Sequence, residues 1–281
     1  MKKSVFQPFL FVFQPLLFAG VCRFAGVLCL FAVCGSQPLR ANEDVIAKAR
    51  SFVGPENELS ALRSVHFKGT LTVMDRDAGG RDVPVNVGLE IIFQKPYRQR
   101  IVATSPEKVE VTALNGYDAW QRIADPTDAS AWQLTILGAD QIKRLRANTW
   151  ENLAFYRGIG DVGGSIEDLG AAQVEGRNCR KLAFRHAANI VFIRYFDEAT
   201  GRLVMTETEA GSTIREEGDL RAGKLRFPQK IVTANRLADG TTRELTVVFD
   251  AVTVNATFAD DLFEVPSFAP SAAPAATPTA K

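Results

Sequence analysis

The sequence predicts a mainly β protein with a few helices, built on one large antiparallel sheet. Apolar and polar residues alternate with a period of two over most of the chain. Short turn sequences such as "ADG" at 238–240 separate these runs, and short turns connect antiparallel strands because parallel pairing needs long crossovers. Helical periodicity is confined to the start and the middle of the chain. A sheet of roughly ten strands curls or splits, and the helices could cover its open side.

The first forty residues form an apolar run unlike the rest of the chain. Lys2 is one of two lysines that precede the run, and Arg23 interrupts it. A basic start, an apolar stretch and small residues at the exit are typical of a secretory signal. We therefore expect residues 1–41 to be a signal peptide that directs export to the periplasm. In the two alternatives, the run stays as an uncleaved membrane anchor, or Cys34 in "LFAVCGS" is lipidated.

The charge balance argues against nucleic acid binding, and the cysteine content argues against a disulfide or a zinc cluster in the mature chain. The chain has 33 basic and 32 acidic residues and a formal charge of +1, which gives no electrostatic case for nucleic acid binding. Cleavage after Ala41 would remove four basic residues and no acids, leaving 29 against 32. It would also leave Cys179 as the one cysteine, which forms neither an internal disulfide nor a zinc cluster. Its strand-like surroundings predict an inert core residue.

The expected elements begin with a helix capped by Asn42 and ended by Gly54 and Pro55. A shorter helix near 56–63 follows. From Ser64 the period changes to two, which predicts the first strand. Residues 139–157 have the spacing of an interior helix. The other predicted strands are "VPVNVGLEIIF", "RQRIVATS", "KVEVTAL", "YDAWQRI", "SAWQLTI", "GRNCRKLAF", "NIVFIRYFD", "RLVMTETE", "STIREEGDL", "FPQKIVTANRL" and "TRELTVVFDAV".

The sequence shows no pattern of catalytic or metal-binding residues. His66 lies on the polar face of a strand and His186 in a predicted turn, and neither has a ligand partner at metal spacing. The acids of "TETE" and "REEGD" alternate along strands and are expected to face solvent. We therefore expect no enzyme activity, no cofactor and no metal. The alternative, an unnoticed hydrolase, requires an acid–base pair within reach of a substrate.

Two arginines and two tryptophans in the first half of the chain have two interpretations each. Arg98 and Arg100 share one face of a strand. They either form a solvated outer face paired with acids such as Glu110, or act as donors at a cavity rim that hold a helix carbonyl or a ligand carboxylate. Trp120 and Trp132 are either ordinary core residues or cavity walls.

Five sequence blocks occur in an order that resembles a known family. They are "KPYRQR" (95–100), "NGYDAW" (115–120), "YFDEATGRLV" (195–204), "GKLRFPQKIV" (223–232) and "VFDAVTVNATFADDLFEVP" (248–266). Together they resemble the periplasmic lipoprotein carrier superfamily, the LolA/LolB-like outer-membrane lipoprotein-sorting proteins. Asn115 replaces the Asp that usually precedes the glycine in that family. The resemblance covers residues 42–266 as one domain, and the Pro/Ala/Thr-rich tail at 267–281 is predicted to be disordered.

The resemblance implies an incomplete antiparallel β-barrel, a strongly curved sheet whose concave side encloses an apolar cavity under the helices. Its expected lining residues are Ile91, Phe93, Val109, Val111, Trp120 and Trp132, with Arg98 and Arg100 at the rim. The implied function is that of a monomeric, non-catalytic carrier or acceptor for lipoproteins or other acyl-chain ligands, working with membrane-associated envelope partners. The alternative is an envelope sensor or assembly protein on the same fold, with a filled core.

Overall fold

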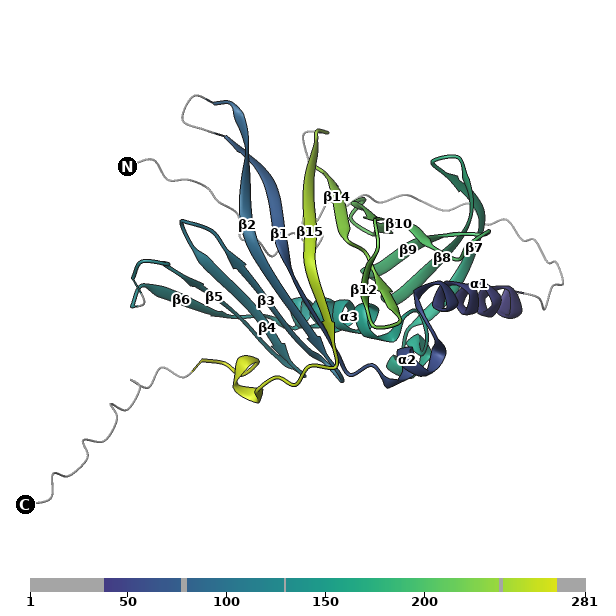
Figure 1. Cartoon of the computed structure of the whole chain (residues 1–281), viewed down its shortest axis with the longest axis horizontal. Coiled ribbons are helices and arrows are strands. Elements are labelled where there is room, and N and C mark those ends of the chain that lie inside the picture. The colour runs from purple at the N-terminus through teal and green to yellow at the C-terminus, as the bar shows by residue number, and fades with distance from the viewer. Residues whose placement is uncertain (1–37, 77–79, 129, 238–239, 267–281) are drawn as a thin grey trace, which may run out of the picture.

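A computed structural model describes residues 38–76, 80–128, 130–237 and 240–266 (Figure 1). The helices are α1 (Pro38–Val53), α2 (Glu56–Ala61) and α3 (Ala139–Ala154), with 3₁₀ turns η2 (Ile159–Val162) and η3 (Asp260–Leu262). The strands are β1 (Ser64–Arg76), β2 (Asp82–Gln94), β3 (Arg98–Thr104), β4 (Val109–Asn115), β5 (Asp118–Ala124), β6 (Trp132–Ile136), β7 (Ser165–Val174), β8 (Arg177–Ala187), β9 (Ile190–Asp197), β10 (Leu203–Thr208), β11 (Thr213–Glu217), β12 (Leu220–Ala222), β13 (Leu225–Phe227), β14 (Lys230–Arg236) and β15 (Thr242–Val254). The predicted tail, Cys34 and most of the predicted signal segment lie outside the described residues.

The strands form one open antiparallel sheet, as the sequence predicts. Thirteen of them follow the order β6-β5-β4-β3-β2-β1-β15-β14-β11-β10-β9-β8-β7, more than the roughly ten expected, and β12 pairs with β13 in a separate hairpin. The first and last strands, β1 and β15, pair in the middle of the sheet, so its two arms spread to either side (Figure 1). Within the described ranges nothing pairs β6 with β7. The sheet is therefore an incomplete barrel, which confirms the predicted fold class.

Bulges bend this sheet. One interrupts the pairing of β1 with β15 between Lys68 and Gly69. A Cβ atom at Gly69 would lie 2.2 Å from the carbonyl oxygen of Val248, so a glycine is needed where the two backbones approach. Bulges increase the local twist, and a sheet of this width curls rather than staying flat. The curvature gives the sheet a concave and a convex face.

The helices pack on the concave face. Helix α3 contacts β2, β3 and β4, and in the view of Figure 1 it passes behind β15. Helix α1 begins at Pro38, ahead of the predicted cap Asn42, and it ends before Gly54 as predicted. Helix α3 ends at Ala154, three residues earlier than predicted, because Phe155 and Tyr156 adopt positive φ angles of 46° and 71°. No helix in the described part of the chain has both the length and the apolar character needed to cross a membrane.

The main hydrophobic core lies between the concave face and the helices. It joins Ala49 of α1 and Leu153 of α3 to buried residues from both arms of the sheet, among them Phe93 of β2 and Phe184 of β8. Smaller clusters cover other parts of the sheet. Cys179 belongs to one of these, is fully buried and unpaired, and burial raises the pKa of its thiol. It is the packed core residue that the sequence predicts.

Candidate ligand cavity

A cavity of about 160 Å³ lies inside the main core, between α3 and the concave face. Much of its wall is aromatic and aliphatic; Phe67, Ile91, Phe93, Phe192, Phe227 and Phe249 are among the residues that line it. A dry apolar cavity of roughly 150 Å³ is large enough to bind benzene, whereas pockets for larger ligands start at roughly 300 Å³. The arrangement therefore has room for a short apolar group.

One wall of this cavity is polar and ionised. Glu151 on α3 lies with Oε2 2.5 Å from Nη2 of Arg194 on β9, and its Oε1 is 2.6 Å from Nε2 of His186 on β8. We call these three residues the Glu151 cluster. Each of the three side chains is less than one-tenth exposed. An ion pair this deeply buried has lost its hydration, so its remaining polar atoms need partners.

The guanidinium of Arg194 is held between aromatic rings. Its Cζ atom lies 4.9 Å from the ring centre of Tyr156 and 5.0 Å from that of Phe184. Its Nε and Nη1 atoms are buried without a hydrogen-bond partner among the described residues. Burial raises the pKa of Tyr156, which keeps the hydroxyl protonated. Arginine stacked on rings in this way is fixed in orientation.

A second acid borders the same space. Glu216 of β11 lines the cavity, although the sequence predicted that the acids of "REEGD" face solvent. Burial raises its pKa, while Arg194 and Arg202 act in the opposite direction. The raised pKa favours the neutral carboxylic acid inside the cavity.

The sequence alone does not predict the Glu151 cluster, because its three residues lie on separate elements. His186 was predicted to lie in a turn, but it is part of β8 and packs against the rings of Trp150 and Phe192. The prediction was wrong because "RHAAN" reads as turn composition. Arg194 did give a signal, since it is the one charged residue inside the apolar stretch "IVFIRYF". Its partner on α3 lies 43 residues earlier in the sequence, so only the fold brings the two together.

The predicted lining residues separate onto two faces. Ile91 and Phe93 line the cavity. Val111 and Trp120 form a cluster on the convex face, against which Val109 packs, and Trp132 shares that face. The register explains the difference, because Ile91 aligns across β3 with Thr112 and not with Val111. A shift of one residue along a strand exchanges the faces.

The two predicted rim arginines also lie on the convex face, away from the cavity. Arg98 donates from Nε to Oδ1 of Asn115 at 3.1 Å and pairs through Nη1 with Asp260 at 2.5 Å. Arg100 lies half-buried two residues along, and burial lowers its pKa. Of the two interpretations, the structure supports the outer face. The expected pairing partner Glu110 instead accepts a hydrogen bond from Gln121.

The closing block of the sequence packs on this convex face as a strap, residues 255–266. Phe263 is fully buried there, and its carbonyl oxygen accepts a 3.1 Å hydrogen bond from Nε1 of Trp120. Gly116, with φ +66°, makes the tight turn that places Asn115 beside Arg98. The "KPYRQR", "NGYDAW" and closing blocks thus meet in one place, where they fasten the strap.

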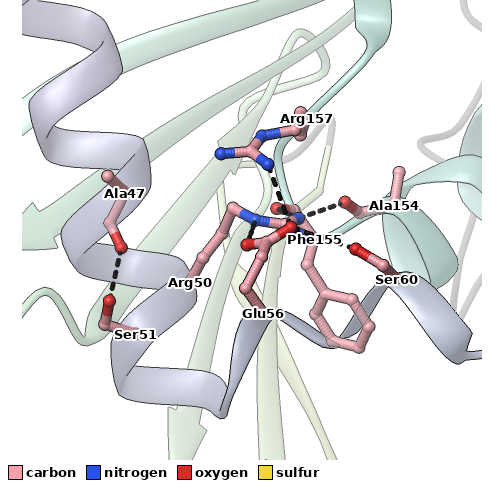
Figure 2. A network of polar contacts seen from close by, with 8 residues as sticks. All are labelled: Ala47, Arg50, Ser51, Glu56, Ser60, Ala154, Phe155 and Arg157. Atoms are coloured by element: carbon pink, nitrogen blue, oxygen red, sulfur yellow. Dashed lines mark hydrogen bonds and ion pairs between the residues drawn. The ribbon is translucent and has the colours of Figure 1, made fainter. Parts of the chain in front are cut away.

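At the edge of the cavity, Arg50 ties α1 to the end of α3 (Figure 2). Its Nη1 atom donates to the carbonyl oxygens of Ala154 and Phe155, both at 2.8 Å, and its Nε and Nη2 atoms donate to Glu56. Arg157 reaches the same carboxylate. The last carbonyl oxygens of a helix have no hydrogen-bond donor within the helix, and here the guanidinium of Arg50 is that donor. The hydrogen bonds from Arg50 lower the pKa of Glu56 despite its slight burial.

Comparisons with known proteins show the fold. The sequence matches no protein-family model, and no curated protein matches it significantly. A LolA superfamily protein from Nitrosomonas europaea is similar in structure, with a TM-score of 0.54 and 13% identity over 80% of this chain and 97% of that one. A DUF1329 family protein from Desulfovibrio piger gives a TM-score of 0.52 and 8% identity over 82% of this chain and 98% of that one. These likenesses confirm the LolA-like architecture that the sequence blocks indicate.

Proposed function

We propose that this chain is a non-catalytic binding protein of the cell envelope that carries or accepts an acyl-chain ligand, such as the lipid of a lipoprotein. The observation that carries the proposal is the aromatic-lined cavity between α3 and the concave face. Its place in a LolA-like fold supports the same reading. Burial of each methylene contributes about 0.8 kcal/mol, so a few buried methylenes give useful affinity without any reacting group.

The proposal includes export and a division of the chain. We propose that residues 1–41 direct the chain to the periplasm, where the domain at 42–266 works as a monomer with membrane-associated partners. Retention as an anchor and lipidation of Cys34 are the alternatives. Intact mass of the protein from fractionated membranes of its host reports both cleavage and acylation.

The volume of the cavity sets a condition on binding. At about 160 Å³ it holds a short apolar group, and a full acyl chain needs more space. Helix α3 would have to move away from the sheet to admit such a chain. The contacts that would have to open include the hydrogen bonds of Arg50 to its last carbonyls, the pairing of Glu151 with Arg194 and the packing of Leu153 in the main core.

Displacement of N-phenylnaphthylamine, a hydrophobic fluorophore, by an acylated peptide tests the proposal. Ile214→Trp fills the cavity from β11, and Ile136→Trp is the matched control, because Ile136 is 62% exposed on the edge strand β6. We expect fluorophore binding to weaken at least tenfold in Ile214→Trp and to stay unchanged in Ile136→Trp. Overpacking alone lowers stability by about 1–3 kcal/mol, so both variants are measured well below their melting temperatures.

The result that would contradict the proposal is an unmodified protein that binds neither fluorophore nor acylated peptide. Equal binding by both tryptophan variants would place the ligand outside this cavity. Lipid extraction of protein purified from envelopes gives an independent check, since a carrier retains part of its cargo.

The small volume favours a second function, an envelope sensor or assembly protein whose core is already nearly filled. Such a protein would capture a partner through its surface. A pull-down from envelope extract, compared with lipid extraction of the same sample, separates the two functions: partner protein without lipid indicates the sensor, and lipid without partner indicates the carrier.

A further inference from the structure

The Glu151 cluster gives the cavity a chemical preference that apolar walls alone would not have. Arg194 is 7% exposed and lines the cavity, and two of its donor atoms, Nε and Nη1, have no protein partner in the described part of the chain. A buried donor without an acceptor is unfavourable, so a residue held in this way is poised for an acceptor that enters the cavity.

The stacking of Arg194 restricts where that acceptor can lie. Tyr156 and Phe184 cover the guanidinium near 5 Å, and Glu151 occupies the Nη2 side. The remaining donors lie on the edge of the guanidinium plane. Nε–H and the Nη1 hydrogens point to different sides of that plane, so an entering oxygen accepts from one of the two, and a carbonyl oxygen in the plane fits either position.

The charges at this wall favour a neutral acceptor over an anion. The carboxylate of Glu151 already offsets the charge of Arg194. Glu216 borders the same space, and a second acid there adds no positive charge in either protonation state. Arg226, which also lines the cavity, pairs with Asp219 at 3.5 Å. Both lining arginines thus already have a carboxylate partner, so an anionic group would enter without a cation of its own, whereas a carbonyl oxygen satisfies a donor without adding charge.

On these grounds we propose that Arg194 binds the acyl carbonyl of the ligand, the ester or amide oxygen next to its hydrocarbon chain. This inference rests on the proposed function, because it assumes that the chain occupies the cavity. It adds the substrate class: acyl esters and amides are selected over ethers and alkanes of equal length.

Paired ligands that differ in one oxygen test the inference. Monolauroylglycerol, lauryl glyceryl ether, N-lauroylethanolamine and the laurate anion are compared as displacers of N-phenylnaphthylamine. We expect the ester and the amide to bind at least tenfold more tightly than the ether. Arg194→Lys keeps a charge beside Glu151 but removes the planar edge, so the difference in affinity between the ester and the ether should disappear. Arg180→Lys, outside the cavity, is the matched control.

The outcomes separate this inference from the proposed function. If no lauryl compound displaces the fluorophore, the proposed function fails and this inference fails with it. If ester and ether bind equally to the unmodified protein, only this inference fails, and that comparison needs no variant to fold. A preference for ester that survives in Arg194→Lys, or a laurate anion that binds tighter than the ester, also overturns it.

Discussion

The indole nitrogen of Trp120 donates a hydrogen bond of 3.1 Å to the carbonyl oxygen of Phe263, a residue 143 positions later in the chain. The contact joins β5, the second strand of the β4–β5 hairpin, to the strap (residues 255–266) that follows β15. Arg98 strengthens the same junction, because it pairs with Asp260 and its guanidinium lies 5.6 Å from the ring centre of Phe263. Trp120 therefore stabilises the convex face of the sheet, whereas the aromatic residues that line the cavity include several phenylalanines.

Phe263→Ala should lower the free energy of unfolding by about 3–5 kcal/mol, because it empties a fully buried aromatic site. Val265→Ala is the matched control two residues along the strap, where the side chain is 41% exposed and the expected change is under about 0.5 kcal/mol. Urea unfolding followed by tryptophan fluorescence measures both. Equal effects would mean that the strap does not stabilise the domain.

Arg50→Met should destabilise the domain by about 2–4 kcal/mol, because the charged donor that satisfies two carbonyls at the end of α3 is lost. Arg157→Met is the control, since Arg157 reaches the same Glu56 but is 60% exposed; a change below about 1 kcal/mol is expected. Hydrogen exchange should accelerate in the last turn of α3 in the first variant alone. Unchanged exchange there would show that Arg50 does not hold the helix end.

Gly69→Ala tests the bulge that lets β1 approach β15. The new Cβ would lie 2.2 Å from the carbonyl oxygen of Val248, so the backbone must shift, and we expect a loss of about 1–3 kcal/mol or more. Gly88→Ala, on the adjacent strand, meets its nearest atom at 3.7 Å. It should be neutral or stabilise by about 0.4–1 kcal/mol. Thermal melting compares them, and similar melting temperatures would refute the close approach.

Glu216 predicts a pH dependence of stability. Burial raises its folded pKa above the ordinary value of about 4.5. Below that value both the folded and the unfolded chain hold the proton, and the group contributes nothing. As the pH rises toward the folded pKa, the unfolded chain releases its proton first, so stability falls. We expect Glu216→Gln to match the unmodified protein in acid and to exceed it increasingly as the pH rises.

The adjacent Glu217→Gln is the control for this comparison. Glu217 is half-exposed and pairs with Lys230 on the outer side of the strand, so its replacement should not reproduce the trend. Urea unfolding at a series of pH values measures the three proteins. A constant difference between Glu216→Gln and the unmodified protein would show that Glu216 does not titrate between the two states.

Local patterns were sufficient for the architecture. Alternation with a period of two located most of the strands but missed β7, which follows a glycine-rich loop. Short turns required antiparallel neighbours. The stop at Gly54 was also read correctly, because a glycine and a proline end a helix whatever surrounds them. The five blocks added the curvature and the order of the family fold. All of these patterns involve residues close together in the chain, so they can be recognised without knowledge of the fold.

The faces of the strands were decided only by the tertiary structure. Alternation shows that Val109 and Val111 point the same way, but not whether that way leads to the cavity. The answer depends on which face α3 covers and on the register across three strands. The Glu151 cluster depends on the same packing, because its members come from α3, β8 and β9. A buried ion pair forms only where the fold brings its two residues together away from water. The periodicity of a single helix or strand cannot predict such a pair, because its residues come from different elements.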